Sequence, residues 1–475
     1  MIETRRLQRG FADGLIAEEV SDLWEPWMRR ADEVLEDEAL LQMAQEALAK
    51  RYQKSKTRGR PGTTAEVVLR LLLLKHIRNW SYEDLHREVR ANLVYREFTR
   101  VGGAQVPDDK TIGRLGRQLG PEVVQNIHER VVAIAQQKEV VSGKKLRVDT
   151  TVVETDIHYP TDSSLLGDGV RVLTRVMKKV TAIAGEVGTQ LRDRKRSVGR
   201  RLMEIGRASR GRGKQAQEKL QKGYEKLLES TSRVVTQAKR FSQEVAAGVK
   251  RSADVFEQAA LEGLKKELDT MAPRVKQVML QTRERIFKGI TDSAGKLVSI
   301  FETSTEIIRK GKAGKPTEFG KMVKIQEAEN QIITSYQVYE KRPADSDLLV
   351  PAIEKHQEQL GRVPRVVAGD AGFYSAKNEA QAQQMGVQQV AVPNLSTKSP
   401  QRKQHQRKRW FRKAQKWRTG CEGRISVLKR RHGLDRCRYK GDDGMKRWVG
   451  FGVIADNLIN IGRALVARQE GQEAG

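Results

Sequence analysis

The chain is poor in cysteine, in aromatic residues and in long apolar runs. Its 475 residues include only two cysteines, Cys421 and Cys437, which form no C-x-x-C pair. This content excludes a disulfide framework or a zinc ribbon and is typical of a reducing compartment. Residues 1–14 lack the apolar stretch of a signal peptide. The strongest apolar run, 67–76, carries an arginine and is about half as long as a membrane span. We therefore expect a soluble, cytoplasmic protein with no membrane partner.

Acidic residues are also in deficit. There are 60 Asp and Glu against 89 Lys and Arg, which leaves a formal net charge of +29. A charge of this size indicates a polyanionic partner, because Lys and Arg that neutralise phosphates release condensed counterions. The composition favours nucleic acid and leaves a ribosome-associated protein and a membrane-surface protein as alternatives. It does not indicate what is done to the nucleic acid.

The length of the chain predicts two or three domains, and the first of them, over 1–140, is expected to be helical. Ser81 has the character of a helix cap, with Glu83 near the capping-box position. Short helices joined by tight turns are typical of a helix-turn-helix-like DNA-binding module, and a plain helical bundle is the alternative. The expected helices run from Thr63 or Thr64 to about 78, over 81–90, from 108 and over 121–137.

A long, basic segment over 161–290 is expected to be an inserted set of amphipathic helices. Apolar residues recur along it every three or four positions, for example at Leu173, Val176 and Val180. Residues 192–214 form its most basic stretch, RDRKRSVGRRLMEIGRASRGRGK. This charge is explained either by solvated helical faces or by contact with DNA or with another subunit.

The segments on either side of this insertion predict a mixed α/β core over 141–160 and 291–463, followed by a tail over 464–475. Residues 145–153 (KLRVDTTVV) are rich in β-branched side chains and follow a turn that contains glycine, which favours a strand. After the insertion we expect strands at 297–301, 322–325, 331–338, 364–370 and 387–392, with helices at 347–360 and from 409. Together these elements predict a sheet flanked by helices.

Three acidic residues lie where a catalytic site would use them. Asp149 is within the first expected strand, and Asp370 ends a later strand beside a Gly turn, where α/β sheets bind ligands. Glu422 is expected near the start of an amphipathic helix. Carboxylates gathered in one place repel each other, but hard cations such as Mg²⁺ prefer oxygen ligands and keep positions open for water and phosphate. Two such ions, about 4 Å apart, can catalyse an in-line phosphoryl displacement.

Basic and aromatic residues surround the third acid. Arg418 and Lys429 are spaced from Glu422 by four and seven residues, which puts all three on one helical face. The preceding stretch, QRKQHQRKRWFRKAQKWR, mixes cations with aromatic rings that can stack on unpaired bases. The candidate DNA-binding residues of this region are Arg409, Trp410, Arg412, Trp417, Arg418 and Lys429.

These motifs resemble the DDE transposases of bacterial insertion sequences, which have a ribonuclease H-like catalytic core. The resemblance runs from about 60 to 463, interrupted by the helical insertion. It rests on VDTTVVET around Asp149, GDAGFYS around Asp370 and the Arg-x₃-Glu-x₆-Lys spacing of Arg418, Glu422 and Lys429. The stretches LLLLKHIRNWSYEDL, YREF, PDDKTIGRL and WVGFGVIADNLINIGR are similar to helical parts of the same enzymes.

The resemblance implies that Asp149, Asp370 and Glu422 are the catalytic acids and hold Mg²⁺ or Mn²⁺, as two ions. Gln415 stands where the family signature begins with tyrosine, and Trp417 is the candidate substitute. The implied reaction is hydrolytic nicking at the ends of an element, followed by direct attack of the released 3′-hydroxyl on target DNA. It also implies a homodimer or larger assembly on paired double-stranded ends and a bacterial, nucleoid-associated location.

Three other functions explain part of the sequence. A metal-dependent DNA nuclease that cuts without joining would use the same acids. A DNA-binding protein derived from a transposase would lack at least one acid, and all three are present. An RNA-binding structural protein explains the charge but not the spaced acids.

Other polar residues near these motifs have simpler interpretations. Glu154 and Asp156 are expected to be solvated loop acids, with a supporting role near Asp149 as the alternative. His158 and His432 are expected to be structural histidines. Cys421 is expected to be a small packed residue.

Overall fold

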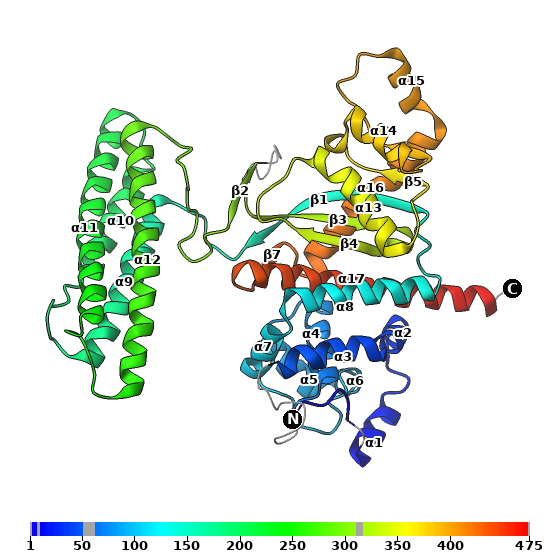
Figure 1. Cartoon of the computed structure of the whole chain (residues 1–475), viewed down its shortest axis with the longest axis horizontal. Helices are drawn as coiled ribbons and strands as arrows, with labels where there is room; N and C mark the ends of the chain where they lie inside the picture. Colours follow the sequence, from blue (N-terminus) through cyan, green and yellow to red (C-terminus); the bar gives the residue numbers. More distant parts are fainter. Residues whose placement is uncertain (1, 7–9, 51–61, 310–316, 474–475) are drawn as a thin grey trace. The chain divides into compact units, whose positions relative to one another are not determined.

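The computed structural model describes residues 2–6, 10–50, 62–309 and 317–473. The chain has a mixed α/β fold in which helices predominate. It divides into two compact units, Met1–Asp156 with Ile308–Gly475, and Ile157–Ile307 (Figure 1). Each unit has an apolar core of its own.

Eight helices form the N-terminal part of the first unit among the described residues. They are α1 (Phe11–Glu19), α2 (Pro26–Leu35), α3 (Glu38–Ala49), α4 (Ala65–Ile77), α5 (Tyr82–Ala91), α6 (Leu93–Phe98), α7 (Asp109–Gln118) and α8 (Gly120–Gln137). Every residue of α4 is buried, as expected of a helix that is apolar on most of its surface. Thr64 caps α4, and Ser81 caps α5 as predicted. The capping box of α5 is completed by Asp84, because it is Asp84 rather than Glu83 that occupies the third helical position.

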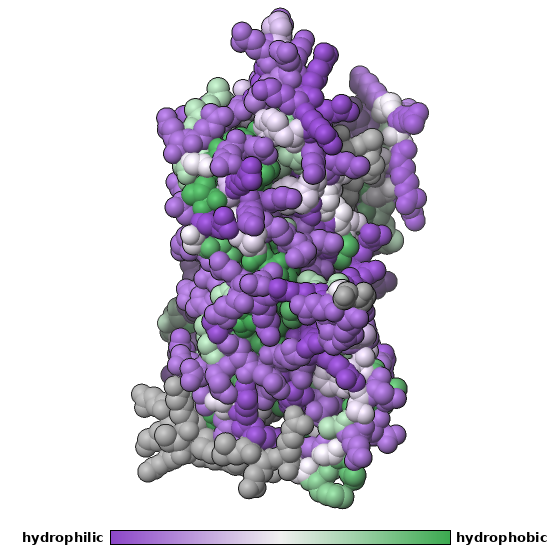
Figure 2. All heavy atoms as spheres, turned by 90° about the vertical axis from the view of Figure 1, so that its right-hand side faces the viewer, coloured by the Kyte–Doolittle hydropathy of each residue, from purple (hydrophilic) through white to green (hydrophobic). Residues whose placement is uncertain are grey.

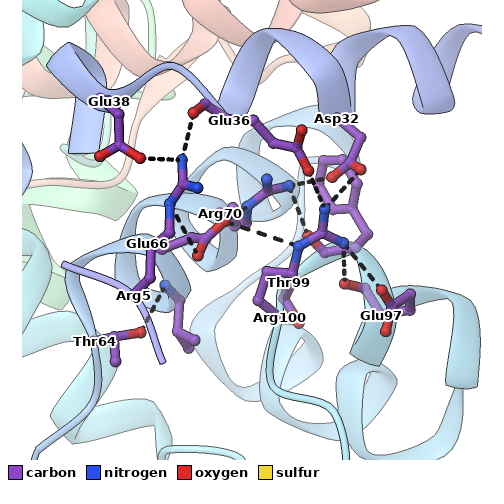
Figure 3. Close-up of polar contacts among 12 residues, drawn as sticks. Arg5, Asp32, Glu36, Glu38, Thr64, Glu66, Arg70, Glu97, Thr99 and Arg100 are labelled. Carbon is purple, nitrogen blue, oxygen red and sulfur yellow. Dashed lines mark hydrogen bonds and ion pairs between the residues drawn. The ribbon is translucent and has the colours of Figure 1, made fainter. Parts of the chain in front are cut away.

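Several charged residues in the core of these helices form ion pairs. Arg70 is fully buried in α4 and pairs with Asp32 at 2.5 Å and with Glu66 at 3.0 Å. Arg100 joins the same group through Asp32 at 2.7 Å (Figure 3). Burial lowers the pKa of Arg70, while Asp32 favours its charged form. The network therefore fixes α2, α4 and the loop after α6 relative to one another.

The last helix, α17 (Gly441–Glu473), belongs to two parts of the first unit. Phe451, Leu458 and Ile461 pack in the core of the N-terminal helices, whereas Trp448 and Val453 pack beneath the sheet. By length and composition α17 could cross a membrane, but 72% of its apolar window is buried inside the protein, as in the core helix of a globular fold. The helix continues through most of the predicted tail at 464–475.

A lysine with aromatic neighbours lies where α4 meets α17. The Nζ atom of Lys75 is 4.6 Å from the ring centroid of Trp448, 5.0 Å from that of Tyr82 and 5.2 Å from that of Tyr439. Lys75 is buried, and this burial lowers its pKa to about 7. The two tyrosine hydroxyls hydrogen bond to each other at 2.8 Å. This aromatic cage joins the N-terminal helices to the C-terminal part of the unit.

A seven-stranded mixed sheet forms the second layer of this unit. Its strands are β1 (Lys145–Thr155), β2 (Glu306–Arg309), β3 (Thr317–Glu327), β4 (Ile333–Val338), β5 (Val366–Ala368), β6 (Gln389–Ala391) and β7 (Arg436–Cys437). The order is β2-β3-β1-β5-β6, and β4 and β7 pair with β3 and β1 respectively. β3 is antiparallel to β1 and to β4, whereas β5 is parallel to β1 and to β6. β1 is therefore the central strand, with Asp149 opposite Ile325.

Helices cover both faces of the sheet. Leu146, Val148 and Val152 of β1 share a core with α13 (Leu349–Leu360) and α14 (Ala376–Gln384). Val153 points to the other face, which α17 and α16 (Arg409–Arg431) cover. The remaining short elements are η1 (Glu329–Gln331), η2 (Asp345–Leu348), η3 (Ala371–Phe373) and α15 (Pro400–Arg407).

The second unit contains a bundle of four helices, α9 (Asp162–Ala184), α10 (Lys195–Ala208), α11 (Lys214–Ala246) and α12 (Val255–Lys288). Leu173, Val176 and Val180 are buried in its core, as their spacing predicts. The prediction of a strand at 297–301 is wrong. This segment follows α12 without strand pairing, because the Leu297 amide donates to the side chain of Gln281, and Ile300 is buried in the core of the bundle.

The surface is mainly hydrophilic on the face that Figure 2 presents, and apolar residues appear there only in small groups. The apolar side chains are instead concentrated in the cores of the two units.

Candidate catalytic cleft

The three predicted acids line one cleft of about 830 Å³ in the first unit. Its walls come from β1, β2, η2 and α16 and from the segments around Arg342 and Asp370. The lining residues are Asp149, Thr150, Thr151, Arg309, Arg342, Asp345, Asp370, Glu422, Ile425, Ser426, Lys429 and Arg430. The cleft thus combines four carboxylates with four basic side chains.

Strand alternation directs Asp149 into this cleft. Side chains alternate between the two faces of a strand, so Asp149 lies on the face of β1 that α16 covers. Its Oδ1 accepts a hydrogen bond from the Thr150 amide at 2.7 Å, and its Oδ2 is 3.5 Å from Nη1 of Arg418. The carboxylate is only 13% exposed, so it is held in place on the floor of the cleft.

Asp370 reaches the cleft from the end of the neighbouring parallel strand. It follows β5 directly and is the cap of η3, where its side chain accepts from the Ala371 amide. β5 is parallel to β1, and its last residue, Ala368, lies opposite Arg147, two residues before Asp149. This short turn therefore brings an exposed carboxylate beside the central strand.

Glu422 lies in the middle of α16, which corrects the expectation that it begins a helix. The helix runs without interruption over 23 residues, through Gly420 and Gly423. Glu422 is 59% exposed, and its Oε1 accepts from Nη2 of Arg418 at 2.6 Å, as the spacing of four residues predicts. Lys429 lies two turns further along and lines the same cleft.

Arg418 is the cation that lies between the acids. It contacts both Asp149 and Glu422, and Asp370 adds to the negative potential around it. Burial alone would lower the pKa of Arg418, but the two ion pairs and Asp370 raise it overall. Within the described ranges no three His, Cys, Asp or Glu side chains are close enough to hold a metal ion directly. The carboxylates are instead balanced by a guanidinium.

The donor set nevertheless suits a hard cation. All four acids of the cleft offer carboxylate oxygens, the ligands that Mg²⁺ and Mn²⁺ take. Arg418 marks the position where these oxygens require positive charge.

A fourth carboxylate of the cleft, Asp345, was not predicted from the sequence. It begins η2, and its Oδ1 accepts a hydrogen bond from the Thr150 hydroxyl at 3.2 Å. Its Cβ is 3.4 Å from the position that a Cβ on Gly372 would take, so it lies against the turn that follows Asp370. In the sequence it stands in a polar loop, PADSDLL, and no local signal separates it from an ordinary turn residue.

A buried ion pair holds α16 against β1. Arg147, two residues before Asp149, pairs with Glu327 of β3 and donates to the Trp417 carbonyl. Burial raises the pKa of Glu327, although the ion pair with Arg147 opposes this effect. A Cβ on Gly420 would collide with the Arg147 guanidinium, so glycine is required where the helix crosses the strand.

Gln415 replaces the tyrosine of the family signature and has a structural role. Its side-chain amide donates to the carbonyls of Ala391 and of Gly369, the latter at 3.2 Å. Gln415 therefore ties α16 to the ends of β6 and β5, beside Asp370.

The aromatic residues of α16 are less available for base stacking than the sequence suggests. Phe411 is buried between α16 and the strands β5 and β6, in a cluster with Ala368 and Ala391. Trp410 packs at the border of this cluster and is partly exposed. Trp417 lies over the Arg147 guanidinium, whose carbon is 4.8 Å from the ring centroid. Arg409 and Arg412 are exposed on the same helix and do not line the cleft.

The other polar residues near the motifs do not line the cleft. Glu154 and Asp156 lie 3.6 Å and 3.9 Å from Arg436. His158 belongs to the second unit and lies 3.7 Å from Asp168. His432 is buried beside Asp456. Cys421 is fully buried, and burial raises the pKa of its thiol.

Two family models match the chain. One, a transposase domain (DUF772), matches residues 25–118, and the other, the transposase DDE domain, matches residues 377–461. The first covers most of the N-terminal helices, and the second contains Glu422 with Arg418 and Lys429. Both matched models are transposase domains, so two separate parts of the chain are similar to transposases. Together the two matches support a DDE transposase of the insertion-sequence type. The comparisons with curated proteins and with solved structures gave no match.

Proposed function

We propose that the protein cleaves DNA at the ends of an insertion element and transfers the released strands into target DNA. The observation that supports this proposal most strongly is the meeting of Asp149, Asp370 and Glu422 in one cleft, although 273 residues separate the first from the last. The mixed sheet with helices on both faces is also consistent with a ribonuclease H-like core.

Asp149, Asp370 and Glu422 would hold the divalent ions, with Asp345 as an additional oxygen donor. Mg²⁺ or Mn²⁺ bound there supplies charge stabilisation to the attacking and leaving oxygens of a phosphoryl displacement. Asp149 is fixed by the Thr150 amide and Asp370 by the Ala371 amide, so both carboxylates are oriented before any ion binds.

The basic residues of the cleft would bind the DNA backbone. Lys429 and Arg430 extend from α16, and Arg309 and Arg342 from the sheet side, around the acids. Arg418 would turn from the carboxylates to a phosphate oxygen. Together these side chains would neutralise the charge that accumulates on the phosphate as water, and later a 3′-hydroxyl, attacks it. Trp410, Arg409 and Arg412 are candidates for contacts beyond the cleft.

Assembly on two paired DNA ends would require at least a homodimer. Strand transfer needs both ends in one complex, so two copies of this cleft would act on one target. The N-terminal helices and the second unit supply surface for DNA contact and for subunit contact.

A nicking assay tests the proposal. A labelled duplex that carries the repeats flanking the gene is incubated with Mg²⁺ and with full-length protein, and either Asp149→Asn or Glu422→Gln is compared with wild type. Glu154→Gln is the matched control, because Glu154 is an acid of the same strand outside the cleft. We expect cleavage at the repeat boundary by wild type and by the control only. Cleavage that survives both cleft substitutions would refute the assignment of the acids.

A second readout separates transposase from nuclease. A pre-nicked end with a free 3′-hydroxyl is offered with supercoiled target plasmid. Joined products support transposition, whereas cleavage without joining in the presence of target supports a nuclease.

A further inference from the structure

The positive charge of the second unit is concentrated in one part of its bundle. Residues 191–226 carry 13 Lys and Arg against 4 Asp and Glu, whereas the other 115 residues of the unit carry 17 against 14. The excess therefore belongs to α10 and the first half of α11. The rest of the bundle is close to neutral, so a general solubilising role does not explain this distribution.

This charge lines a groove of about 570 Å³ along α10 and α11. The lining residues are Glu204, Arg207, Ala208, Gly211, Arg212, Gln215, Ala216, Lys219, Lys222, Gly223 and Lys226. Five of them are basic, and Glu204, the one acid among them, is paired with Arg201 at 2.8 Å. The groove therefore presents an almost uniformly positive wall.

Small residues let the two helices approach closely beneath these cations. A Cβ on Gly223 of α11 would be 2.9 Å from Ile205 of α10, tighter than a normal contact. The apolar side chains of α10, such as Val198 and Ile205, are buried in the core of the bundle. The lysines of α11 at 219, 222 and 226 follow helical spacing and so stand along one face.

The cations of the groove are not needed to hold the bundle together. Arg207, Arg212, Lys219 and Lys222 are exposed, and none of them forms an ion pair with an acid in the described part of the chain. Like charges gathered on neighbouring helices repel one another, which disfavours the fold unless an anion binds. An anionic ligand would remove this repulsion.

We propose that this groove binds the sugar-phosphate backbone of duplex DNA, in addition to the catalytic cleft. This proposal rests on the proposed function for the nature of the polyanion. No aromatic residue lines the groove, so it offers no ring on which an unpaired base could stack. It offers cations alone, which neutralise phosphates without reading sequence. The binding is therefore independent of base sequence and of divalent metal.

Binding of a labelled 40-base-pair duplex of arbitrary sequence tests this assignment. Full-length protein is titrated in EDTA at several salt concentrations, and the groove variant Arg207→Gln/Lys219→Gln/Lys222→Gln is compared with wild type. The matched control is Lys239→Gln/Arg240→Gln/Lys266→Gln, which removes the same charge from exposed positions of α11 and α12. On α11 the control positions begin 17 residues beyond Lys222, roughly 25 Å along the helix.

We expect the groove variant to bind at least about tenfold more weakly than the control at low salt. Its log–log salt slope should fall by about 2.7, because each lost phosphate contact contributes about 0.9. Equal affinities and salt slopes for the groove variant and the control would overturn the proposal. The proposal would also be overturned if the groove variant lost binding to polyglutamate as strongly as it lost binding to DNA, because this result would indicate an acidic protein partner. Thermal unfolding of both variants checks that the bundle is intact.

The same proteins distinguish this proposal from the proposed function. If wild type fails to cleave DNA with Mg²⁺ but the groove variant still loses binding in EDTA, the groove stands and the proposed catalysis fails. If cleavage depends on Asp149 and Glu422 while binding is unchanged in the groove variant, the proposed catalysis stands and the groove proposal fails.

Discussion

The candidate catalytic cleft and the groove of the helical bundle use charge in opposite ways. In the cleft, carboxylates and cations are interleaved, and Arg418 contacts Asp149 and Glu422 directly. In the groove, four cations lack acidic partners among the described residues and are exposed. A cleft with internal ion pairs can be held rigid without its ligand, whereas the groove depends on an external anion for neutralisation. The ion-paired cleft suits a reaction at one defined phosphate, and the groove suits binding to a DNA backbone of any sequence.

The largest expected effect separates the two regions by function. Asp149→Asn should lower DNA cleavage by at least about 10²-fold, the scale of losing one electrostatic element of an active site, and leave duplex affinity nearly unchanged. The groove variant should instead weaken affinity and retain cleavage at saturating DNA. Single-turnover cleavage and anisotropy titrations measure the two quantities. If both variants changed both quantities in parallel, the division between the regions would be wrong.

The next effect concerns the ion pair beneath the cleft. Glu327→Gln leaves Arg147 buried without its charge partner, which should destabilise the first unit by about 3–5 kcal/mol. Urea denaturation measures this change. Glu229→Gln, which breaks the exposed pair with Arg233 in the bundle, is the control and should have little effect. Comparable losses for the two variants would show that the buried pair has no special role.

A smaller effect is expected at the crossing of α16 and β1. Gly420→Ala should cost about 1–3 kcal/mol, because its Cβ would displace the Arg147 guanidinium. Gly423→Ala, in the same helix with no atom within 4 Å of the added Cβ, should be neutral or stabilising. Thermal midpoints of the pair give a direct comparison. A loss at 423 equal to that at 420 would show that the collision with Arg147 is not the cause of the loss.

The last expected effect is a pH dependence at the aromatic cage. Burial lowers the pKa of Lys75 to about 7, from 10.5 in the unfolded chain. Between these values the unfolded chain binds one more proton, so stability should rise with pH by up to about 1.4 kcal/mol per unit. Comparison of urea unfolding at pH 7 and 9 should show a smaller rise in Lys75→Met than in wild type. The exposed substitution Lys266→Met should follow wild type, and identical slopes in all three proteins would contradict the expected deprotonation.

Local sequence patterns correctly predicted the elements whose burial follows from strand alternation or helical periodicity. The β-branched run around Asp149 forms β1, the Gly turn places Asp370 at a strand end, and the spacing of Leu173, Val176 and Val180 predicts a buried stripe. In each case neighbouring residues in the sequence determine the outcome, because alternation or helical periodicity decides which side is buried.

Predictions from the sequence failed where contacts between residues far apart in the chain determine the structure. Val298 and Ile300 resemble strand residues, but they are buried with the bundle instead of pairing in a sheet. Phe411 stands in a basic run that suggested stacking on DNA, yet it fills the space beside Ala368 and Ala391. Asp345 becomes a cleft residue only through its contact with Thr150, 195 residues away in the chain. None of these contacts leaves a periodic signal.

The sharing of α17 between the N-terminal helices and the sheet has a consequence for synthesis. Residues 441–473 leave the ribosome after all the elements that they contact, and Phe451, Leu458 and Ile461 complete a core whose other members were made first. A nascent chain without α17 would expose this apolar surface, so the N-terminal helices would mature only when translation of the helix is finished. Premature termination would then yield a chain that is degraded or aggregates, rather than a DNA-binding fragment that competes with the intact enzyme.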